Sequence, residues 1–405
     1  MTLDNFDKLG VSAPLVAILK RLGITEPTEI QTQVIPPAMA GKNILASAET
    51  GSGKTVAFLL PIIERLEKPG ALRALILAPT RELAIQIETN AKRYSRKAGL
   101  RTLVVVGGEN LARQIKALRA GVDILIATPG RMNDLLERGA VRLKETEVFV
   151  LDEADRMLDM GFLPQVRQIT RHLPAKRQTM LLTATLSRAV EQLAREMMSN
   201  AVRLESETSA TTVATLDQKA FPVGSHAKLP LLLALLKQHK EGSFVVFTQT
   251  RRGADRLSQV LIANNHDVVT LHSDRTQSQR NRALASFRDG QVRVLIATDV
   301  AARGIDVSHI AFVVNYEVPA TADEYIHRVG RTARAGRAGV ALTLVSPEEE
   351  TALASIERAT GIRMERAKVN GFSDGRTEEQ IRIATEVARL RSSSRNSYSR
   401  SRAFR

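Results

Sequence analysis

The chain has no cysteine and no tryptophan, and aromatic residues make up only 4% of its 405 residues. The absence of cysteine excludes disulfide bonds and thiolate metal sites. No stretch approaches the ~20 apolar residues that a membrane span needs, and the first residues lack the pattern of a signal peptide. We therefore expect a cytoplasmic protein that has no contact with a membrane.

Basic residues outnumber acidic ones, 58 to 43, and the net charge is +15. Such an excess is typical of proteins that bind a polyanion, either nucleic acid or an anionic membrane surface. The C-terminal residues 391–405 carry no acidic side chain and form no apolar face, which argues against membrane insertion. We expect a disordered basic tail over 368–405 that aids RNA contact, with a purely solubilising role as the alternative.

Short apolar runs alternate with helical stretches along most of the chain, and 43% of the residues are hydrophobic. Runs that are nearly all apolar are typical of strands covered on both faces, as in a doubly wound parallel sheet. The length fits about two or three domains. Strands are expected at 44–48, 74–78, 102–106, 124–127, 148–151 and 179–182, and again at 244–247, 268–271, 292–296, 312–315 and 340–345.

A polar, small-residue stretch interrupts this alternation near residues 205–217. We interpret it as a flexible linker between an N-terminal domain, 1–204, and a C-terminal domain, 218–367. The second domain has no phosphate loop of its own, so the two halves differ in chemistry.

Residues 48–55, Ala-Glu-Thr-Gly-Ser-Gly-Lys-Thr, follow the first apolar run and match a phosphate-binding loop except that alanine replaces its first glycine. Glycines let successive backbone N–H groups turn toward phosphate at a helix N-terminus. Lys54 would reach the β- and γ-phosphates, and the Thr55 hydroxyl would bind Mg²⁺. Nucleoside triphosphate binding is the prediction.

The acidic segment Asp152-Glu153-Ala154-Asp155 follows the apolar run 148–151. Asp152 would hold Mg²⁺ through water, and Glu153 would orient or deprotonate the attacking water. Helix N-capping explains Asp152 or Asp155 singly, but not both acids together with an upstream phosphate loop. Three arginines lie within residues 328–334. Composition alone favours a solvated basic face over arginine fingers for the γ-phosphate, so the choice depends on the family that the chain resembles.

Taken in order, these segments resemble the DEAD-box ATP-dependent RNA helicases of superfamily 2 over about residues 5–350. Residues 151–162 look most like the bacterial RhlE-like subgroup. The matching pieces are Phe6, 23–31, 48–55, 79–84, 107–108, 128–131, 152–155, 183–185, 247–248, Gln279 with Arg282, 298–299, 303–306 and 327–334.

The resemblance implies an α/β fold of two tandem RecA-like parallel-sheet domains, with a Q motif at 4–32, and ATP and Mg²⁺ as cofactors. Phe6 would stack on the adenine or, alternatively, anchor the core. Thr183 stands where the family has serine. The implied ATP-binding residues are Phe6, Thr28, Gln31, Ala48, Glu49, Thr50, Gly51, Ser52, Gly53, Lys54, Thr55, Gly304 and Asp306. The implied catalytic residues are Lys54, Asp152, Glu153, His327, Arg331 and Arg334. The implied Mg²⁺-binding residues are Thr55 and Asp152, and the implied coupling residues are Asp155, Thr183 and Thr185.

The resemblance also implies contacts with the RNA sugar–phosphate backbone that are independent of the base sequence. The residues for this role are Arg81, Gly108, Thr128, Arg131, Thr248, Arg282 and Thr298. Turn or cap chemistry is the alternative for Thr80 and Thr128 individually.

The expected activity is RNA-stimulated ATP hydrolysis coupled to domain closure and to local, non-processive opening of short duplexes. Two alternatives stay open, an RNA clamp or remodelling scaffold and a DNA-translocating motor. The resemblance implies ribosomal or messenger RNA–protein complexes as partners without selecting among them. A monomer is the default expectation, because no dimerisation domain fits after residue 370.

Overall fold

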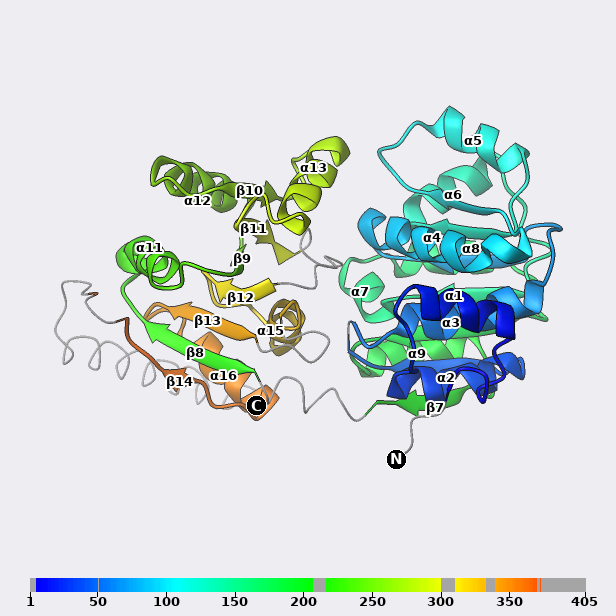
Figure 1. The fold of residues 1–405 in the computed structure, drawn as a ribbon, viewed down its shortest axis with the longest axis horizontal. Coiled ribbons are helices and arrows are strands. Elements are labelled where there is room, and N and C mark those ends of the chain that lie inside the picture. The colour runs from blue at the N-terminus through cyan, green and yellow to red at the C-terminus, as the bar shows by residue number, and fades with distance from the viewer. Residues whose placement is uncertain are drawn as a thin grey trace, which may run out of the picture. The chain divides into compact units, whose positions relative to one another are not determined.

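The computed structural model describes residues 5–49, 51–206, 216–299, 310–332, 339–369 and 372. The chain divides into two compact units, Met1–Ser209 and Ala210–Arg405, each built on its own sheet (Figure 1). Within the described part, no helix combines the length and the apolar character that crossing a bilayer requires.

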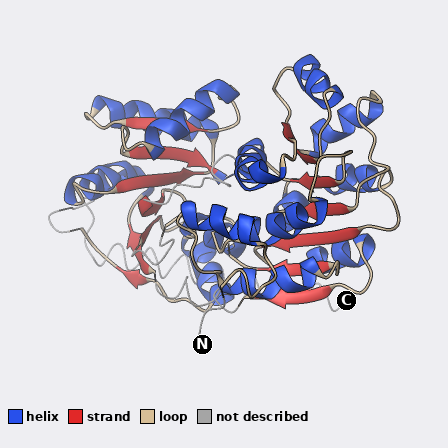
Figure 2. Ribbon diagram, turned by 45° about the vertical axis from the view of Figure 1, so that its right-hand side comes forward, coloured by secondary structure: helices blue, strands red, loops and turns tan. Residues whose placement is uncertain are grey.

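The described residues of the first unit contain seven parallel strands in the order β3-β4-β2-β5-β6-β1-β7, with helices on both faces of the sheet (Figure 2). Strand β1 pairs with β6 on one side and β7 on the other. The strands are β1 Ile44–Ser47, β2 Ala74–Leu77, β3 Thr102–Val105, β4 Ile124–Ala127, β5 Val148–Leu151, β6 Gln178–Thr183 and β7 Val202–Glu205.

Alternate residues of these strands pack into two separate cores. On β5, Val148 and Val150 join the helices α1 to α4, whereas Phe149 and Leu151 join α6 to α9. The helices are α1 Ala13–Arg21, α2 Glu29–Met39, α3 Lys54–Leu66, α4 Arg81–Ser95, the 3-10 turn η1 Arg96–Ala98, α5 Leu111–Arg119, α6 Pro129–Glu137, α7 Ala154–Asp159, α8 Leu163–Thr170 and α9 Arg188–Met197.

The second unit repeats this architecture with the strand order β10-β11-β9-β12-β13-β8-β14, again all parallel. Helices α11 and α12 pack on one face of the sheet, and α13, α15 and α16 pack on the other. The elements are β8 Asp217–Pro222, η2 Ser225–Ala227, α11 Lys228–Gln238, β9 Ser243–Thr248, α12 Arg251–Ala263, β10 Val268–Leu271, α13 Gln277–Arg288, β11 Val294–Thr298, β12 Ile310–Asn315, α15 Ala322–Val329, β13 Val340–Val345, α16 Glu350–Thr360 and β14 Glu365–Arg366.

The predicted fold class, tandem RecA-like parallel sheets, is confirmed, and every predicted strand lies within two residues of its observed position. The sequence missed β7, β8 and β14. Residues of β7 alternate between half-buried and exposed, as suits an edge strand, and so lack a continuous apolar run. Most of the predicted linker, residues 207–215, lies outside the described residues, as does almost all of the predicted tail, residues 370, 371 and 373–405.

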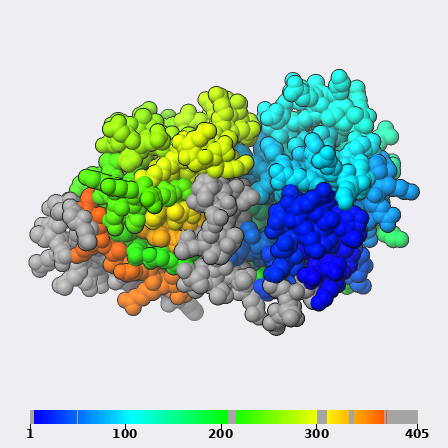
Figure 3. Space-filling model, in the orientation of Figure 1, coloured from blue at the N-terminus to red at the C-terminus, as the bar shows by residue number. Residues whose placement is uncertain are grey.

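The N-terminal residues form one continuous region on the surface of the first unit, coloured dark blue in Figure 3. Phe6 is only 1% exposed and packs in the core that α1 and α2 share with the sheet. This packing corresponds to the core-anchor alternative for Phe6, and its contact with adenine stays a prediction.

Candidate nucleotide and nucleic-acid site

The carboxyl edge of the first sheet brings four predicted motifs together. The neighbouring strands β2, β5, β6 and β1 all run in the same direction, so the segments that follow them meet at one edge. These segments contain Arg81, Asp152 and Lys54, and Thr183 is the last residue of β6. Open α/β sheets bind their ligands at this edge.

The phosphate loop ends at Gly53, which has φ +95° and caps helix α3. Gly53 has no side chain with which to cap this helix, and the first backbone N–H groups of a helix form a suitable site for an anion. The buried Lys54 donates from Nζ to the carbonyls of Ala48 and Glu49. Burial lowers the pKa of Lys54, while the charges of Asp152, Asp155 and Glu153 oppose that shift. Thr50 lies outside the described residues.

Gln31 connects helix α2 to the phosphate loop. Its Nε2 donates to the Gly53 carbonyl at 3.1 Å, and its Oε1 accepts from the Thr28 backbone N–H at 3.0 Å. Thr28 Oγ1 also donates to the Ser52 carbonyl at 2.7 Å. The side chains of Thr28 and Gln31 form a capping box, which helix-capping rules could have found. Binding of ATP by Gln31 stays a prediction.

Asp152 is a buried carboxylate at the end of β5. Its Oδ1 accepts from the Glu153 backbone N–H at 3.0 Å. Burial, followed by the charge of Glu153, raises the pKa of Asp152 to about 7, although Lys54 opposes the change. A buried carboxylate at this edge of the sheet suits a site for a cation.

Glu153 has left-handed backbone angles, φ +52° and ψ +54°, and occupies the N-cap position of α7 without a capping hydrogen bond. Its side chain instead pairs with Arg156, at 2.8 Å between Oε2 and Nη1. Left-handed non-glycine residues are uncommon and cluster at functional sites. Glu153 thus holds the N-cap position of α7, and not Asp152 or Asp155, the two residues for which N-capping was the alternative.

Asp155 joins the acidic segment to the end of β6. Its Oδ2 accepts from the backbone N–H of Ala184 at 3.0 Å and from the N–H and hydroxyl of Thr185 at 2.9 and 3.1 Å. Thr183 Oγ1 donates to the Thr185 carbonyl at 2.8 Å. The three predicted coupling residues therefore form one hydrogen-bonded group, although their coupling role itself remains a prediction.

Two predicted RNA-binding residues of the first unit lie against each other. Gly108 has φ +76°, and any Cβ at this position would overlap the guanidinium of Arg81. Arg131 donates to Gln114 Oε1 at 2.7 Å and to the Glu109 carbonyl at 3.3 Å. Arg131 therefore fixes the segment that follows β3, where Gly108 lies.

In the second unit, Thr248 and Thr298 are paired residues at the carboxyl ends of β9 and β11. Arg282 is exposed on α13, and Gln279 forms a capping box with Thr276 at the start of that helix. Gln279 therefore has a structural role that explains its presence without RNA.

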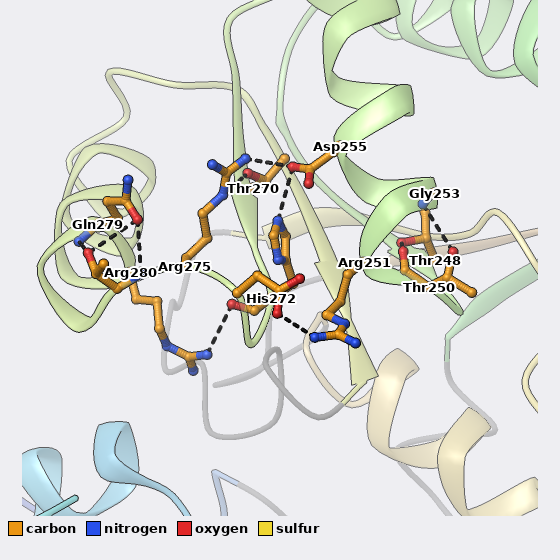
Figure 4. Close-up of polar contacts among 12 residues, drawn as sticks. Thr248, Thr250, Arg251, Gly253, Asp255, Thr270, His272, Arg275, Gln279 and Arg280 are labelled. Atoms are coloured by element: carbon orange, nitrogen blue, oxygen red, sulfur yellow. Dashed lines mark hydrogen bonds and ion pairs between the residues drawn. The ribbon is translucent and has the colours of Figure 1, made fainter. Parts of the chain in front are cut away.

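A polar network beside Thr248, which the sequence reasoning missed, organises the segment between β10 and α13 (Figure 4). Asp255 accepts from Arg275 at 2.6 Å and lies 3.0 Å from His272 Nε2. Arg275 Nε also donates to Thr270 Oγ1 at 3.0 Å, and Arg280 Nη1 reaches the His272 carbonyl at 3.5 Å. The residues of this network are dispersed from 255 to 280, and no local pattern in the sequence connects them.

The arginine-rich segment is not a solvated face where the structure describes it, since Arg328 is 1% and Arg331 3% exposed. Arg328 binds Asp299 through two contacts of 2.6 and 2.7 Å, and Arg331 Nε donates to the His327 carbonyl at 3.0 Å. Sequence reasoning gave no role to Arg328, because its spacing resembles that of the other arginines. The predicted finger Arg334 and the predicted ATP residues Gly304 and Asp306 lie outside the described residues.

Comparison with known proteins gives a family match in each of the two units. A family model for the DEAD/DEAH box helicase matches residues 28–193, and one for the helicase conserved C-terminal domain matches residues 227–336. The DEAD-box ATP-dependent RNA helicase CshA of Geobacillus kaustophilus is 38% identical over 385 residues, which cover 95% of this chain and 82% of that protein. DEAD-box ATP-dependent RNA helicase 30 of Arabidopsis thaliana is 44% identical over 81% of this chain and 57% of its own length.

Solved structures give the same result. Saccharomyces cerevisiae Dbp5 bound to RNA and ADP BeF3 has a TM-score of 0.83 and 31% identity, and the match covers 95% of this chain and 99% of Dbp5. Mss116p bound to single-stranded RNA and AMP-PNP has a TM-score of 0.80 and 26% identity, covering 96% and 82%. The RhlE-like subgroup stays a prediction. With these matches and the motifs gathered at one sheet edge, the chain belongs to the family of DEAD-box ATP-dependent RNA helicases.

Proposed function

We propose that this chain hydrolyses ATP when RNA is bound and uses the cycle to open short RNA duplexes or remodel RNA–protein complexes. The observation that supports this most directly is the group around Asp155. One carboxylate there joins the acidic segment after β5 to the Thr183–Thr185 segment after β6. A change at the nucleotide can therefore reach a second segment of the same sheet edge.

Mg²⁺ would be held by Asp152 and Thr55. The fit is supported by the buried carboxylate of Asp152 directly after β5 and by the position of Thr55 beside Lys54 in the first turn of α3. The ion would neutralise charge on the phosphates. The chain's own residues position the reactants, Lys54 at the phosphates and Glu153 at the attacking water.

The fingers in this proposal are Arg331 and Arg334, both from the second unit. A guanidinium that meets the γ-phosphate stabilises the charge that develops as the bond breaks. Because the phosphate loop belongs to the first unit, hydrolysis would require the two units to act together. RNA bound to both units would favour that state and so accelerate turnover.

RNA would be held through its sugar–phosphate backbone. Arg81, Arg131 and Arg282 supply positive charge, while Gly108 and the threonines supply small polar surfaces. Contacts of this kind do not read bases, and contact with the ribose 2′-hydroxyl would favour RNA over DNA. The RNA-bound state of the solved relative Dbp5 supports the same partner class for this chain.

The test is an ATPase assay with matched RNA and DNA strands, followed by strand displacement on a short RNA duplex. RNA should accelerate ATP turnover, DNA should accelerate it much less, and the duplex should open without processive movement. Equal turnover with and without RNA would refute the coupling. Stimulated turnover without strand displacement would instead favour the clamp alternative. The cytoplasmic location, the monomeric state and the choice between ribosomal and messenger RNA complexes stay predictions.

A further inference from the structure

Arg156 is a buried cation beside the acidic segment, and the motifs assign it no role. Its side chain is 3% exposed, and its Nη1 donates to Glu153 Oε2 at 2.8 Å. Arginine is almost never buried to this extent unless it is paired. Burial of the Arg156 guanidinium therefore costs free energy of desolvation, and its pairing with Glu153 calls for an explanation.

The two neighbouring acids have other hydrogen-bond donors. Asp155 Oδ2 accepts from Ala184 and Thr185, and Asp152 Oδ1 accepts from the Glu153 backbone. The cation of the phosphate loop, Lys54, donates to two loop carbonyls. Arg156 Nη1 makes a charge-assisted contact with the Glu153 carboxylate.

The spacing of Glu153 and Arg156 along α7 brings their two side chains together. Glu153 is the N-cap of α7 with left-handed backbone angles, and Arg156 lies three residues later, one turn along the same side of the helix. Both residues of the pair therefore belong to the first unit.

We infer that Arg156 is a positioning residue for Glu153, holding its carboxylate in the orientation that activates water. The inference rests on the proposed function of Glu153 as the group that orients or deprotonates the attacking water. A carboxylate in that role must be held close to one geometry, because a small displacement of a reacting group costs a large factor in rate. Arg156 supplies the restraint, and Asp155 anchors the segment from which both side chains project.

The test compares Arg156→Gln, which removes the charge, with Arg156→Lys, which keeps the charge but loses the planar guanidinium. We expect Arg156→Gln to lower kcat for RNA-stimulated ATP hydrolysis by about 10- to 100-fold. Arg156→Lys should lose about three- to tenfold, because a lysine makes a single-point contact. KM for ATP should stay within about twofold in both variants, as expected when ground-state binding is intact.

Arg138→Gln is the matched control. Arg138 also pairs with a carboxylate in the first unit, Asp134 at 2.6 Å, but its side chain is 56% exposed and far from the acidic segment in sequence. Its removal should leave kcat unchanged. Thermal unfolding and binding of a fluorescent ATP analogue check that each variant is folded.

A double-mutant cycle separates positioning from general structural support. In a Glu153→Gln background, adding Arg156→Gln should change single-turnover hydrolysis by less than about twofold, because Arg156 would act through the carboxylate already removed. A further large loss in that background would overturn the inference, as would an unchanged kcat in Arg156→Gln or faster RNA-independent turnover. If Arg156→Gln does not fold, Arg156→Lys decides, and wild-type kcat in that variant overturns the inference. Absence of RNA-stimulated hydrolysis in the wild type would refute the proposed function instead.

Discussion

Buried polar side chains hold the site together at the scale of single residues. Gln31, Asp155 and Arg328 are 2%, 5% and 1% exposed, and each binds groups distant in the sequence. A buried polar group that loses its partners costs the full desolvation penalty, about 1–3 kcal/mol. Substitutions at these residues should therefore alter both the stability and the geometry of the site.

Gln31→Ala removes the connection between α2 and the phosphate loop. We expect the free energy of unfolding to fall by about 1–2 kcal/mol, since a capping contact and a loop contact are lost together. ATP should bind more weakly in an equilibrium titration. The matched control is Gln33→Ala on the same helix, whose side chain donates to Glu29 Oε1 at 3.2 Å. Equal ATP affinity in the two variants would contradict the prediction.

Arg331→Ala tests the finger. We expect kcat for ATP hydrolysis to fall about 10³-fold or more while binding of a nonhydrolysable ATP analogue is broadly retained, because a finger acts on the transition state. Arg331 is buried, so circular dichroism must show that the variant is folded. Full ATPase activity in a folded variant would overturn the account of a split site. Arg334→Ala is expected to behave in the same way.

At the scale of secondary structure, one carboxylate connects the amino ends of three neighbouring strands. Asp123, immediately before β4, accepts from the backbone N–H of Gly70 at 2.6 Å and of Arg101 at 2.8 Å. It also pairs with Arg101 Nε at 3.0 Å. Gly70 and Arg101 precede β2 and β3, so these contacts hold together the amino ends of neighbouring strands, on the edge opposite the site.

Asp123→Asn tests how the stability of the fold depends on pH. Burial raises the pKa of Asp123, but the hydrogen bonds and charge of Arg101 and the Gly70 N–H outweigh burial and hold the pKa below its usual value. A depressed pKa stabilises the fold above the unfolded-state value of about 3.9, and that contribution is lost as the pH falls through the folded-state pKa. The variant should be about 1–3 kcal/mol less stable at pH 7.

Denaturant unfolding as a function of pH measures this effect. The difference in stability between wild type and Asp123→Asn should shrink as the pH falls below about 4. Asp134→Asn, which alters an exposed pair with Arg138, should show almost no difference at any pH. A constant difference across the acid range would show that the charge of Asp123 does not contribute.

Central strands were predictable from sequence, and edge strands were not. The run Val148–Leu151 is apolar throughout because helices cover both faces of β5. Strand β7 pairs with only β1 and exposes Arg203 and Glu205, so its sequence resembles a loop. A strand is recognised in a sequence by the run of apolar residues that it buries, and an edge strand buries fewer of them.

At the scale of the whole molecule, ATP and RNA should each strengthen binding of the other. Linkage requires equal factors, and coupling of this kind is typically about 5- to 150-fold. Anisotropy of a labelled RNA, with and without a nonhydrolysable ATP analogue, gives one factor. Nucleotide titrations with and without RNA give the other. Independent binding of the two ligands would contradict the proposed coupling between ATP and RNA.

The sequence by itself determined the parallel α/β fold class, the phosphate loop, the acidic segment and the helicase family. These depend on local patterns, since apolar runs, glycine spacing and acid pairs act over a few residues. Only the tertiary structure decided which distant groups meet, including Gln31 at Gly53, Asp155 at Thr185 and Arg328 at Asp299. The physical reason is that the order of strands within a sheet differs from their order along the chain, so the partners of a buried polar group come from elements that no local pattern connects.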